Sequence, residues 1–172
     1  PPQYNGYKVY WEDGGQIPPE RACAIQTLIA GVEDITAVHP MEETLARATG
    51  LLRAVPAAVD RAYLDSVLGL LASELSERMT CRVLYTPLHG AGNVPVTQAL
   101  SEAGFQVSLV QAQCEPDPDF STVKYPNPED PEVFALALAQ ARQEPVDLIM
   151  ATDPDADRLG VMVRDGTGAY QL

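Results

Sequence analysis

The pattern that most restricts the fold is an alternation of short apolar segments and helix-like segments in the second half of the chain. Three apolar runs have the length of strands: residues 82–85, 105–110 and 146–151. Helical patterns over about 93–103 and 131–142 separate them, and strands separated by helices pair in parallel through right-handed crossovers. A strand over 159–163 follows a short loop, so it returns antiparallel. This order predicts a three-layer α-β-α domain with a mixed, mainly parallel sheet of about four strands.

The first third of the chain holds elements that lack partners. The patterns there predict a strand over residues 7–11 and helices over about 18–32 and 42–48. Because these elements cannot bury both faces of a sheet, residues 1–55 are expected to be the end of a partial α/β domain plus a linker. A helix from Pro56 to about Leu75 is expected to open the second domain, residues 56–172.

Charge and composition exclude several classes of protein. The net charge of −13 disfavours nucleic acid and anionic membrane surfaces as partners, because both would be repelled. No apolar run approaches the roughly 20 residues of a membrane span. Three widely spaced cysteines, Cys23, Cys81 and Cys114, form no Cys-x-x-Cys pair, so a reducing cytoplasm fits best.

A group of carboxylates follows the apolar run that ends at residue 151. In Asp153-Pro154-Asp155-Ala156-Asp157-Arg158, alternate aspartates share one side if the backbone is extended. At roughly 4 Å, each pair of carboxylates repels by on the order of 4 kcal/mol at an effective dielectric near 20. A divalent cation would offset this repulsion, so the segment is predicted to be a metal-binding loop.

Three other interpretations of this segment compete with a metal-binding loop. A calcium-binding EF-hand needs glycine at its sixth place and glutamate at its twelfth, where this chain has Arg158 and Arg164. A loop whose aspartate is the phosphoryl-accepting nucleophile usually continues into Thr or Ser, and here Arg158 follows. The third interpretation is a solvated turn without metal.

Four segments in this order resemble the α-D-phosphohexomutase family, which includes phosphoglucomutases and phosphomannomutases. They are Tyr4-Asn5-Gly6-Tyr7-Lys8, Tyr85-Thr86-Pro87-Leu88-His89-Gly90-Ala91-Gly92, Glu115-Pro116-Asp117-Pro118 with Pro126-Asn127-Pro128-Glu129, and the aspartate segment 153–158. The forms of the second and fourth segments are similar to the phosphoglucomutase and phosphopentomutase branch. The resemblance implies that the chain covers the end of the first of four domains and the whole second domain.

The resemblance implies a role for each of several residues. Asp153, Asp155 and Asp157 are expected to hold Mg²⁺, and Arg158 to meet phosphoryl oxygens, with a plain salt bridge to the aspartates as the alternative. Lys8 resembles the active-site lysine of the family; a solvated lysine is the alternative.

His89 lies in a glycine-flanked loop between a strand and a helix. It is expected either to contact the substrate, where backbone amides at the helix start can receive an anion, or to make structural or interdomain hydrogen bonds.

The implied activity is that of a Mg²⁺-dependent isomerase, an intramolecular phosphotransferase. Glucose 1-phosphate and glucose 6-phosphate would be interconverted through a phosphoserine and a sugar 1,6-bisphosphate intermediate. Phosphopentose or phosphomannose substrates, and a non-catalytic metal-binding or assembly module, are alternatives. The family's Ser-His-Asn tripeptide is not in this sequence, so the chain is expected to need its missing domains 1, 3 and 4 for turnover.

Overall fold

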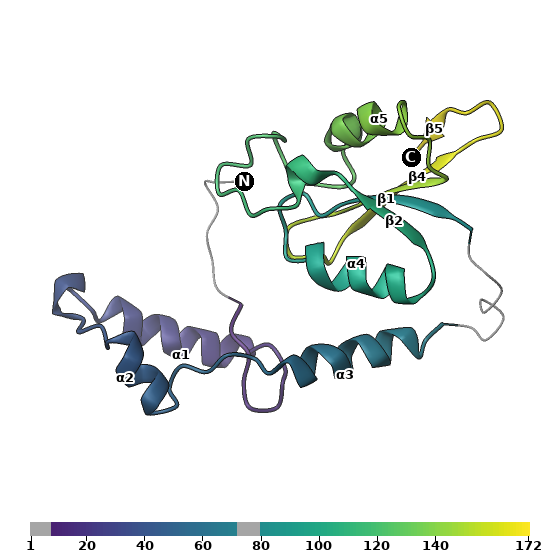
Figure 1. The fold of residues 1–172 in the computed structure, drawn as a ribbon. Helices are drawn as coiled ribbons and strands as arrows, with labels where there is room; N and C mark the ends of the chain where they lie inside the picture. Colours follow the sequence, from purple (N-terminus) through teal and green to yellow (C-terminus); the bar gives the residue numbers. More distant parts are fainter. Residues whose placement is uncertain (1–7, 72–79) are drawn as a thin grey trace. The chain divides into compact units, whose positions relative to one another are not determined.

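The computed structural model describes residues 8–71 and 80–172, which form two compact units (Figure 1). The N-terminal unit ends at Val55, and the α/β unit comprises the described residues from Pro56 to Leu172. Among the helices in these ranges, none combines the length and the apolar character of a membrane-spanning segment.

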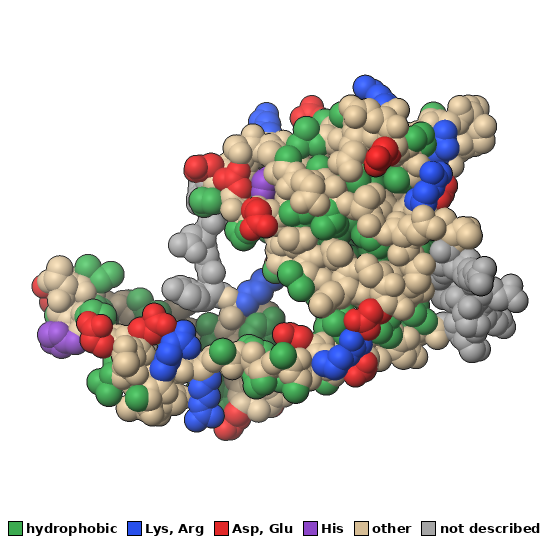
Figure 2. Space-filling view, viewed as in Figure 1, with side chains coloured by type: hydrophobic (Ala, Val, Ile, Leu, Met, Phe, Trp, Pro, Cys, Tyr) green, Lys and Arg blue, Asp and Glu red, His purple; other side chains and the backbone are tan. Residues whose placement is uncertain are grey.

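The N-terminal unit contains three short helical elements: α1 (Pro19–Ala30), η1 (Ile35–Ala37) and α2 (Glu43–Ala48). Proline at the start of α1 suits a position whose N–H has no intrahelical acceptor. The two α-helices confirm the sequence-based predictions. No residue among the described part of this unit is buried, and Figure 2 shows hydrophobic side chains across its surface.

The strand predicted over residues 7–11 is not formed in the described residues. Tyr10 makes one isolated antiparallel bridge to Gln16, and Ile17 donates its N–H to the Val9 carbonyl oxygen at 3.0 Å. A strand needs a neighbouring strand to take up its backbone groups, and only the short return after the turn at residues 12–15 lies across from it. Tyr7 lies outside the described residues.

The α/β unit is built on a five-stranded sheet, which confirms the predicted α/β class. The strands are β1 (Arg82–Thr86), β2 (Gln106–Leu109), β3 (Leu148–Thr152), β4 (Leu159–Arg164) and β5 (Tyr170–Gln171). Their order is β2-β1-β3-β4-β5; the pairs β1·β2 and β1·β3 are parallel, and β3·β4 and β4·β5 are antiparallel. The sheet is therefore evenly mixed and has one short strand more than expected.

The helical elements of this unit are α3 (Ala57–Leu68), α4 (Asn93–Glu102), η3 (Gln111–Gln113), η4 (Pro131–Phe134) and α5 (Ala135–Ala141). Helix α3 is shorter than the prediction to about residue 75. It ends at Gly69, where Leu70 and Leu71 donate to carbonyl oxygens three residues back, as in a tightened last turn. Residues 72–75 lie outside the described part of the chain.

The strand order explains the three layers. The connection from β1 to β2 moves one way along the sheet, and the connection from β2 to β3 moves the other way across β1. Right-handed crossovers in opposite directions place their helices on opposite faces. Accordingly α4 covers one face and α5 the other (Figure 1).

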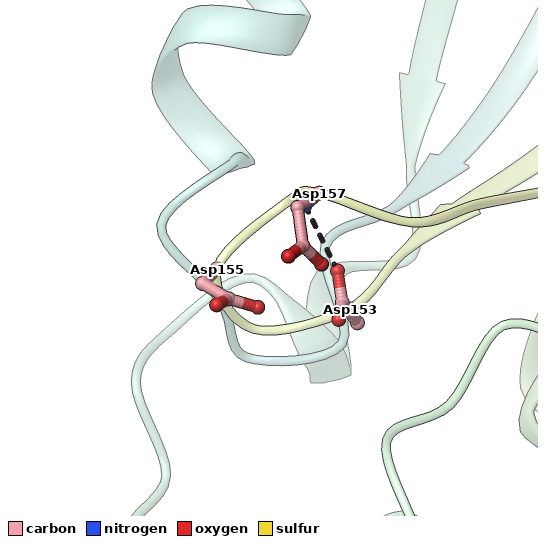
Figure 3. A group of neighbouring side chains, drawn as sticks. All are labelled: Asp153, Asp155 and Asp157. Carbon is pink, nitrogen blue, oxygen red and sulfur yellow. Dashed lines mark hydrogen bonds between the residues drawn. The ribbon is translucent and has the colours of Figure 1, made fainter. Parts of the chain in front are cut away.

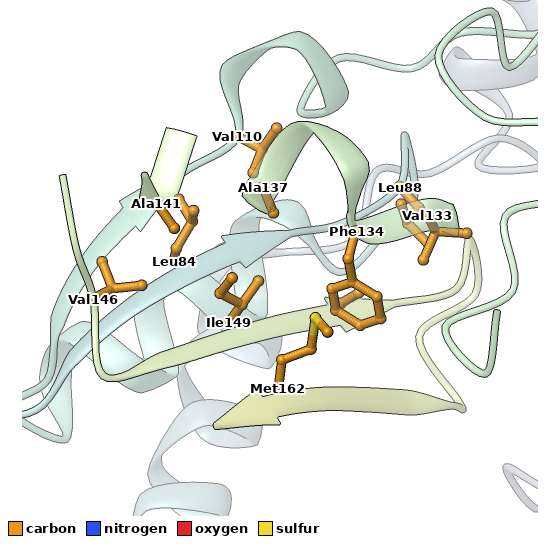
Figure 4. Close-up of a cluster of buried hydrophobic side chains, with 11 residues drawn as sticks. Leu84, Leu88, Val110, Val133, Phe134, Ala137, Ala141, Val146, Ile149 and Met162 are labelled. Atoms are coloured by element: carbon orange, nitrogen blue, oxygen red, sulfur yellow. The ribbon is translucent and has the colours of Figure 1, made fainter. Parts of the chain in front are cut away.

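The core lies between the sheet and α5 (Figure 4). Leu84, Ile149 and Met162 are directly paired across β1, β3 and β4, so their side chains share this face. Phe134 and Ala137 pack on them from η4 and α5, and both are fully buried. This packing fixes the carboxyl ends of β1 and β3, where the candidate site is found.

Candidate metal centre and its supporting loops

The candidate site lies at the carboxyl ends of β1 and β3, where the connections that follow these two strands leave in different directions. The β1–α4 loop, residues 87–92, leads to α4, and the aspartate loop, residues 153–158, returns the chain into β4. Ligands of open α/β sheets bind outside the carboxyl ends of strands at such points. The Ala91 N–H donates to the Pro154 carbonyl oxygen at 2.8 Å, so the two loops are in contact.

Three carboxylates converge in the aspartate loop. One oxygen from each of Asp153, Asp155 and Asp157 lies within 4.8 Å of the others. Figure 3 shows the three side chains pointing toward a common space inside the loop. The convergence comes from a turn, in which the Ala156 N–H donates to the Asp153 carbonyl oxygen at 3.0 Å, and not from an extended backbone.

Asp153 is the structural centre of this loop. Its side chain is buried, with a residue exposure of 2%. Its Oδ1 accepts the backbone N–H groups of Asp157 and Arg158 at 3.1 and 3.0 Å, and its Oδ2 accepts Arg158 Nε at 2.9 Å. Because a carboxylate offers about four acceptor positions, Asp153 can still give one to a cation.

Arg158 is held beside the carboxylates by its own side-chain contacts. Its Nε pairs with Asp153, and its Nη1 donates to Asn127 Oδ1 at 3.0 Å. The hydrogen bond to Asp153 raises the pKa of Arg158 above its usual range, and the charges of Asp153, Glu129 and Asp157 act in the same direction. The guanidinium is about half exposed and has five N–H donors, so three remain after the two side-chain hydrogen bonds made among the described residues.

The donor set fits a small, hard divalent cation. All three ligand groups are carboxylate oxygens, the type that Mg²⁺ prefers. Two oxygens on opposite sides of Mg²⁺ lie about 4.2 Å apart, since each bond is about 2.1 Å long. The three carboxylate oxygens all lie within 4.8 Å of one another, which is of this order, and Asp155 and Asp157 are exposed.

The β1–α4 loop has a conformation that uses its own backbone amides. Leu88 and His89 have positive φ angles of 47° and 63°. Four successive N–H groups are engaged: Leu88 to Thr86 Oγ1, His89 to Gln113 O, Gly90 to Pro87 O and Ala91 to Pro154 O. Only the Ala91 amide supports the aspartate loop; the other three bond to β1, to the loop itself and to the segment after β2, so these four amides are occupied. An anion site at the start of α4, which begins at Asn93, stays a prediction.

His89 is buried, at 8% exposure, and both of its ring nitrogens have partners within the fold. Nδ1 lies 2.8 Å from the Glu115 carbonyl oxygen, and Nε2 lies 2.7 Å from Thr122 Oγ1. A carbonyl oxygen only accepts, so Nδ1 carries the proton in this contact. Both ring nitrogens are thus engaged within the fold, as the structural alternative expects, and contact of His89 with a substrate stays a prediction.

The network around His89 extends into the sheet. Gln113 donates from Nε2 to Thr122 Oγ1 at 3.2 Å and accepts from Thr86 Oγ1 at 2.7 Å. Thr122 therefore accepts from Gln113 and can donate its hydroxyl to His89 Nε2. Sequence reasoning missed Gln113, which is fully buried; nothing in the local sequence Gln111-Ala112-Gln113 distinguishes it from the exposed Gln111.

Lys8 is exposed and belongs to the N-terminal unit, so its role stays a prediction. Asn127 was given no role by the sequence reasoning, yet it contacts Arg158 directly. Its position between two prolines in a loop that carries acidic residues was the signal for an ordered segment near the site.

Comparison with known proteins agrees with this architecture. Residues 61–166 match the family model described as phosphoglucomutase/phosphomannomutase, alpha/beta/alpha domain II, and residues 1–36 match the model of alpha/beta/alpha domain I. The fold is therefore that of a phosphosugar mutase domain. The chain belongs to the phosphoglucomutase/phosphomannomutase family, the α-D-phosphohexomutases, as the four sequence segments predicted.

Curated relatives in this family are similar over nearly the whole chain. Phosphoglucomutases of Staphylococcus epidermidis (strain ATCC 12228) and Staphylococcus haemolyticus are 38% and 36% identical to it over 173 and 171 residues. Each match covers 98% of this chain, which spans only 30% of the length of these relatives.

Two solved structures share the fold. A putative phosphomannomutase from Thermus thermophilus has a TM-score of 0.61 and 27% identity, covering 91% of this chain and 32% of that one. A family protein from Burkholderia thailandensis has a TM-score of 0.54 and 21% identity, covering 65% and 22%.

Proposed function

We propose that this chain is the metal-binding part of a phosphosugar mutase that interconverts glucose 1-phosphate and glucose 6-phosphate. The curated relatives that favour this substrate are named phosphoglucomutases. In the proposal, residues 1–55 end the first domain and residues 56–172 are the second. The protein would act in the cytoplasm, with a sugar 1,6-bisphosphate as intermediate.

Asp153, Asp155 and Asp157 would hold Mg²⁺ in this enzyme. When bound, the ion supplies positive charge that offsets the charge of a transferring phosphoryl group. The chain's own part is to bring three oxygens together from a loop fixed by Asp153.

Arg158 would bind the oxygens of the phosphoryl group. Its charge is secured by Asp153, and three of its N–H donors are available for phosphate oxygens among the contacts described. Lys8 would hold or deliver a proton at the reacting hydroxyl. The phosphoserine would come from the earlier part of the first domain and the groups that select the sugar from other domains, so the 172-residue chain by itself would not turn over substrate.

The convergence of three aspartate oxygens beside Arg158 carries this proposal, and Asp155→Ala in the full-length protein tests it. Mutase turnover should fall by on the order of 100-fold or more, because the loss of electrostatic stabilisation acts on the transferring group. Asp119→Ala changes an exposed aspartate in the proline-rich loop, residues 115–131, and should leave turnover near wild type. Normal turnover in Asp155→Ala would refute the metal assignment.

The substrate is tested by assaying full-length protein with glucose, mannose and pentose phosphates. A clear preference for mannose or pentose phosphate would replace the glucose assignment while keeping the mutase. Absence of turnover with all of them, together with no serine in the expected Ser-His-Asn position before Pro1, would favour the non-catalytic module.

A further inference from the structure

Asn127 links the proline-rich loop to the aspartate loop. Its Oδ1 accepts Arg158 Nη1 at 3.0 Å and the backbone N–H of Glu129 at 3.1 Å. Both of these groups can only donate, so the atom they share must be the amide oxygen. The orientation of the Asn127 amide is thus determined by its partners.

The backbone that carries Asn127 is fixed on both sides. The flanking Pro126 and Pro128 are buried, and the Asn127 N–H donates to the Tyr125 carbonyl oxygen at 2.8 Å. Pro128 packs against Gly160 at the start of β4 so closely that a Cβ on Gly160 would clash with the Pro128 carbonyl oxygen. The backbone of Asn127 is therefore held between two buried prolines, one of which packs against strand β4.

Arg158 is held at two separate nitrogens by groups of different loops. Asp153 Oδ2 accepts from Nε at 2.9 Å, and Asn127 Oδ1 accepts from Nη1. A single contact would leave a long side chain free to rotate, whereas two contacts fix the plane of the guanidinium. Both N–H groups of Nη2 and the second N–H of Nη1 have no partner among the described residues.

We propose that Asn127 is a positioning residue. Together with Asp153 it orients the Arg158 guanidinium so that the N–H groups of Nη2 and the second N–H of Nη1 donate hydrogen bonds to the phosphoryl oxygens. This inference rests on the proposed function for the identity of the ligand. The orientation of Arg158 itself can be measured without turnover.

The test compares Asn127→Ala with Asn127→Asp, which keeps acceptor oxygens at the same place. In the 172-residue chain, NMR of the Arg158 Nε–H should show faster exchange with water in Asn127→Ala and a wild-type signal in Asn127→Asp. In the full-length protein, kcat should fall about 10- to 100-fold in Asn127→Ala with a smaller change in KM, as expected for one lost hydrogen bond to a charged group. Asn127→Asp should recover most of this loss.

Asn93→Ala is the matched control. Asn93 donates to the Cys114 carbonyl oxygen at 3.0 Å and does not contact Arg158, so its loss should lower the melting temperature but leave the Arg158 signal unchanged. The proposal is overturned if Asn127→Ala keeps the wild-type Arg158 signal, or if both alanine variants lose kcat equally. Failure of the proposed function appears separately, as wild-type full-length protein without mutase turnover, and the NMR comparison still decides the role of Asn127.

Discussion

Gly90 lies directly against Pro154, so that a Cβ on Gly90 would come within 2.5 Å of Pro154 Cα and 2.6 Å of its carbonyl oxygen. These atoms belong to the backbone, and they cannot move aside as a flexible side chain can. The neighbouring Ala91 N–H donates to the same carbonyl oxygen. The glycine therefore allows the β1–α4 loop to approach the aspartate loop closely enough for that hydrogen bond to form.

Gly90→Ala is expected to displace the aspartate loop. The added methyl group must push Pro154 away, at a cost of roughly 1–3 kcal/mol in the free energy of unfolding, as for other overpacked sites. Mg²⁺ binding, measured by calorimetry, should weaken as the carboxylates move. Gly166→Ala is the control, because a Cβ there meets no atom within 4 Å. Equal stability of the two variants would show that the contact is not tight.

Asp157→Asn should have opposite effects with and without metal. In EDTA the variant should be more stable than wild type by about 0.2–1 kcal/mol, because one of three mutually repelling carboxylates is neutralised at an exposed position. Wild type should gain melting temperature on addition of millimolar Mg²⁺, and the variant should gain much less. A variant that gains as much as wild type would remove Asp157 from the set of metal ligands.

Thr122→Val tests the buried network around His89. The substitution keeps the side-chain volume but leaves His89 Nε2 and Gln113 Nε2 without their shared partner. Unsatisfied buried polar groups cost about 1–3 kcal/mol each, so urea unfolding should show a loss of that order. Ser101→Ala, on the exposed side of α4, should change stability little. A neutral Thr122→Val would mean that water replaces the hydroxyl.

The low pKa of Asp165 is expected to cause part of the acid sensitivity of the α/β unit. Its carboxylate accepts from Thr167 Oγ1 and the Thr167 N–H, and these bonds, with smaller contributions from Ala169 and Gln171, lower its pKa to about 2 from 3.8. A pKa that is lower in the folded protein contributes stability above about pH 4, which is lost as the pH falls toward 2. In urea unfolding across this range, Asp165→Asn should lose less stability than wild type. Parallel pH profiles of the two proteins would contradict this.

The arrangement of helices and strands could be predicted because it depends on local patterns. The apolar runs that became β1, β3 and β4 and the helix signals at Pro18 and Pro131 all lie within short windows of sequence. The prediction of a strand over residues 7–11 was wrong because strand pairing depends on a neighbouring strand, which a local pattern does not contain.

The site was predicted less completely than the fold. The spacing of Asp153, Asp155 and Asp157 indicated that they converge, but the turn that achieves it depends on the buried side chain of Asp153. The contacts of His89 and Asn127 join segments 26 to 33 residues apart, and no periodicity in the sequence encodes such pairs.

The positive φ angle of Ala156, 59°, has a consequence for how this sequence can diverge. A residue with a Cβ is destabilised by on the order of 1–2 kcal/mol in this region of backbone conformation, whereas glycine is not and asparagine is affected little. Homologues that keep the same turn should therefore carry glycine, asparagine or alanine here and exclude valine, isoleucine and threonine. The residue types found at this position in homologous sequences should therefore show whether the turn is kept, without further structures.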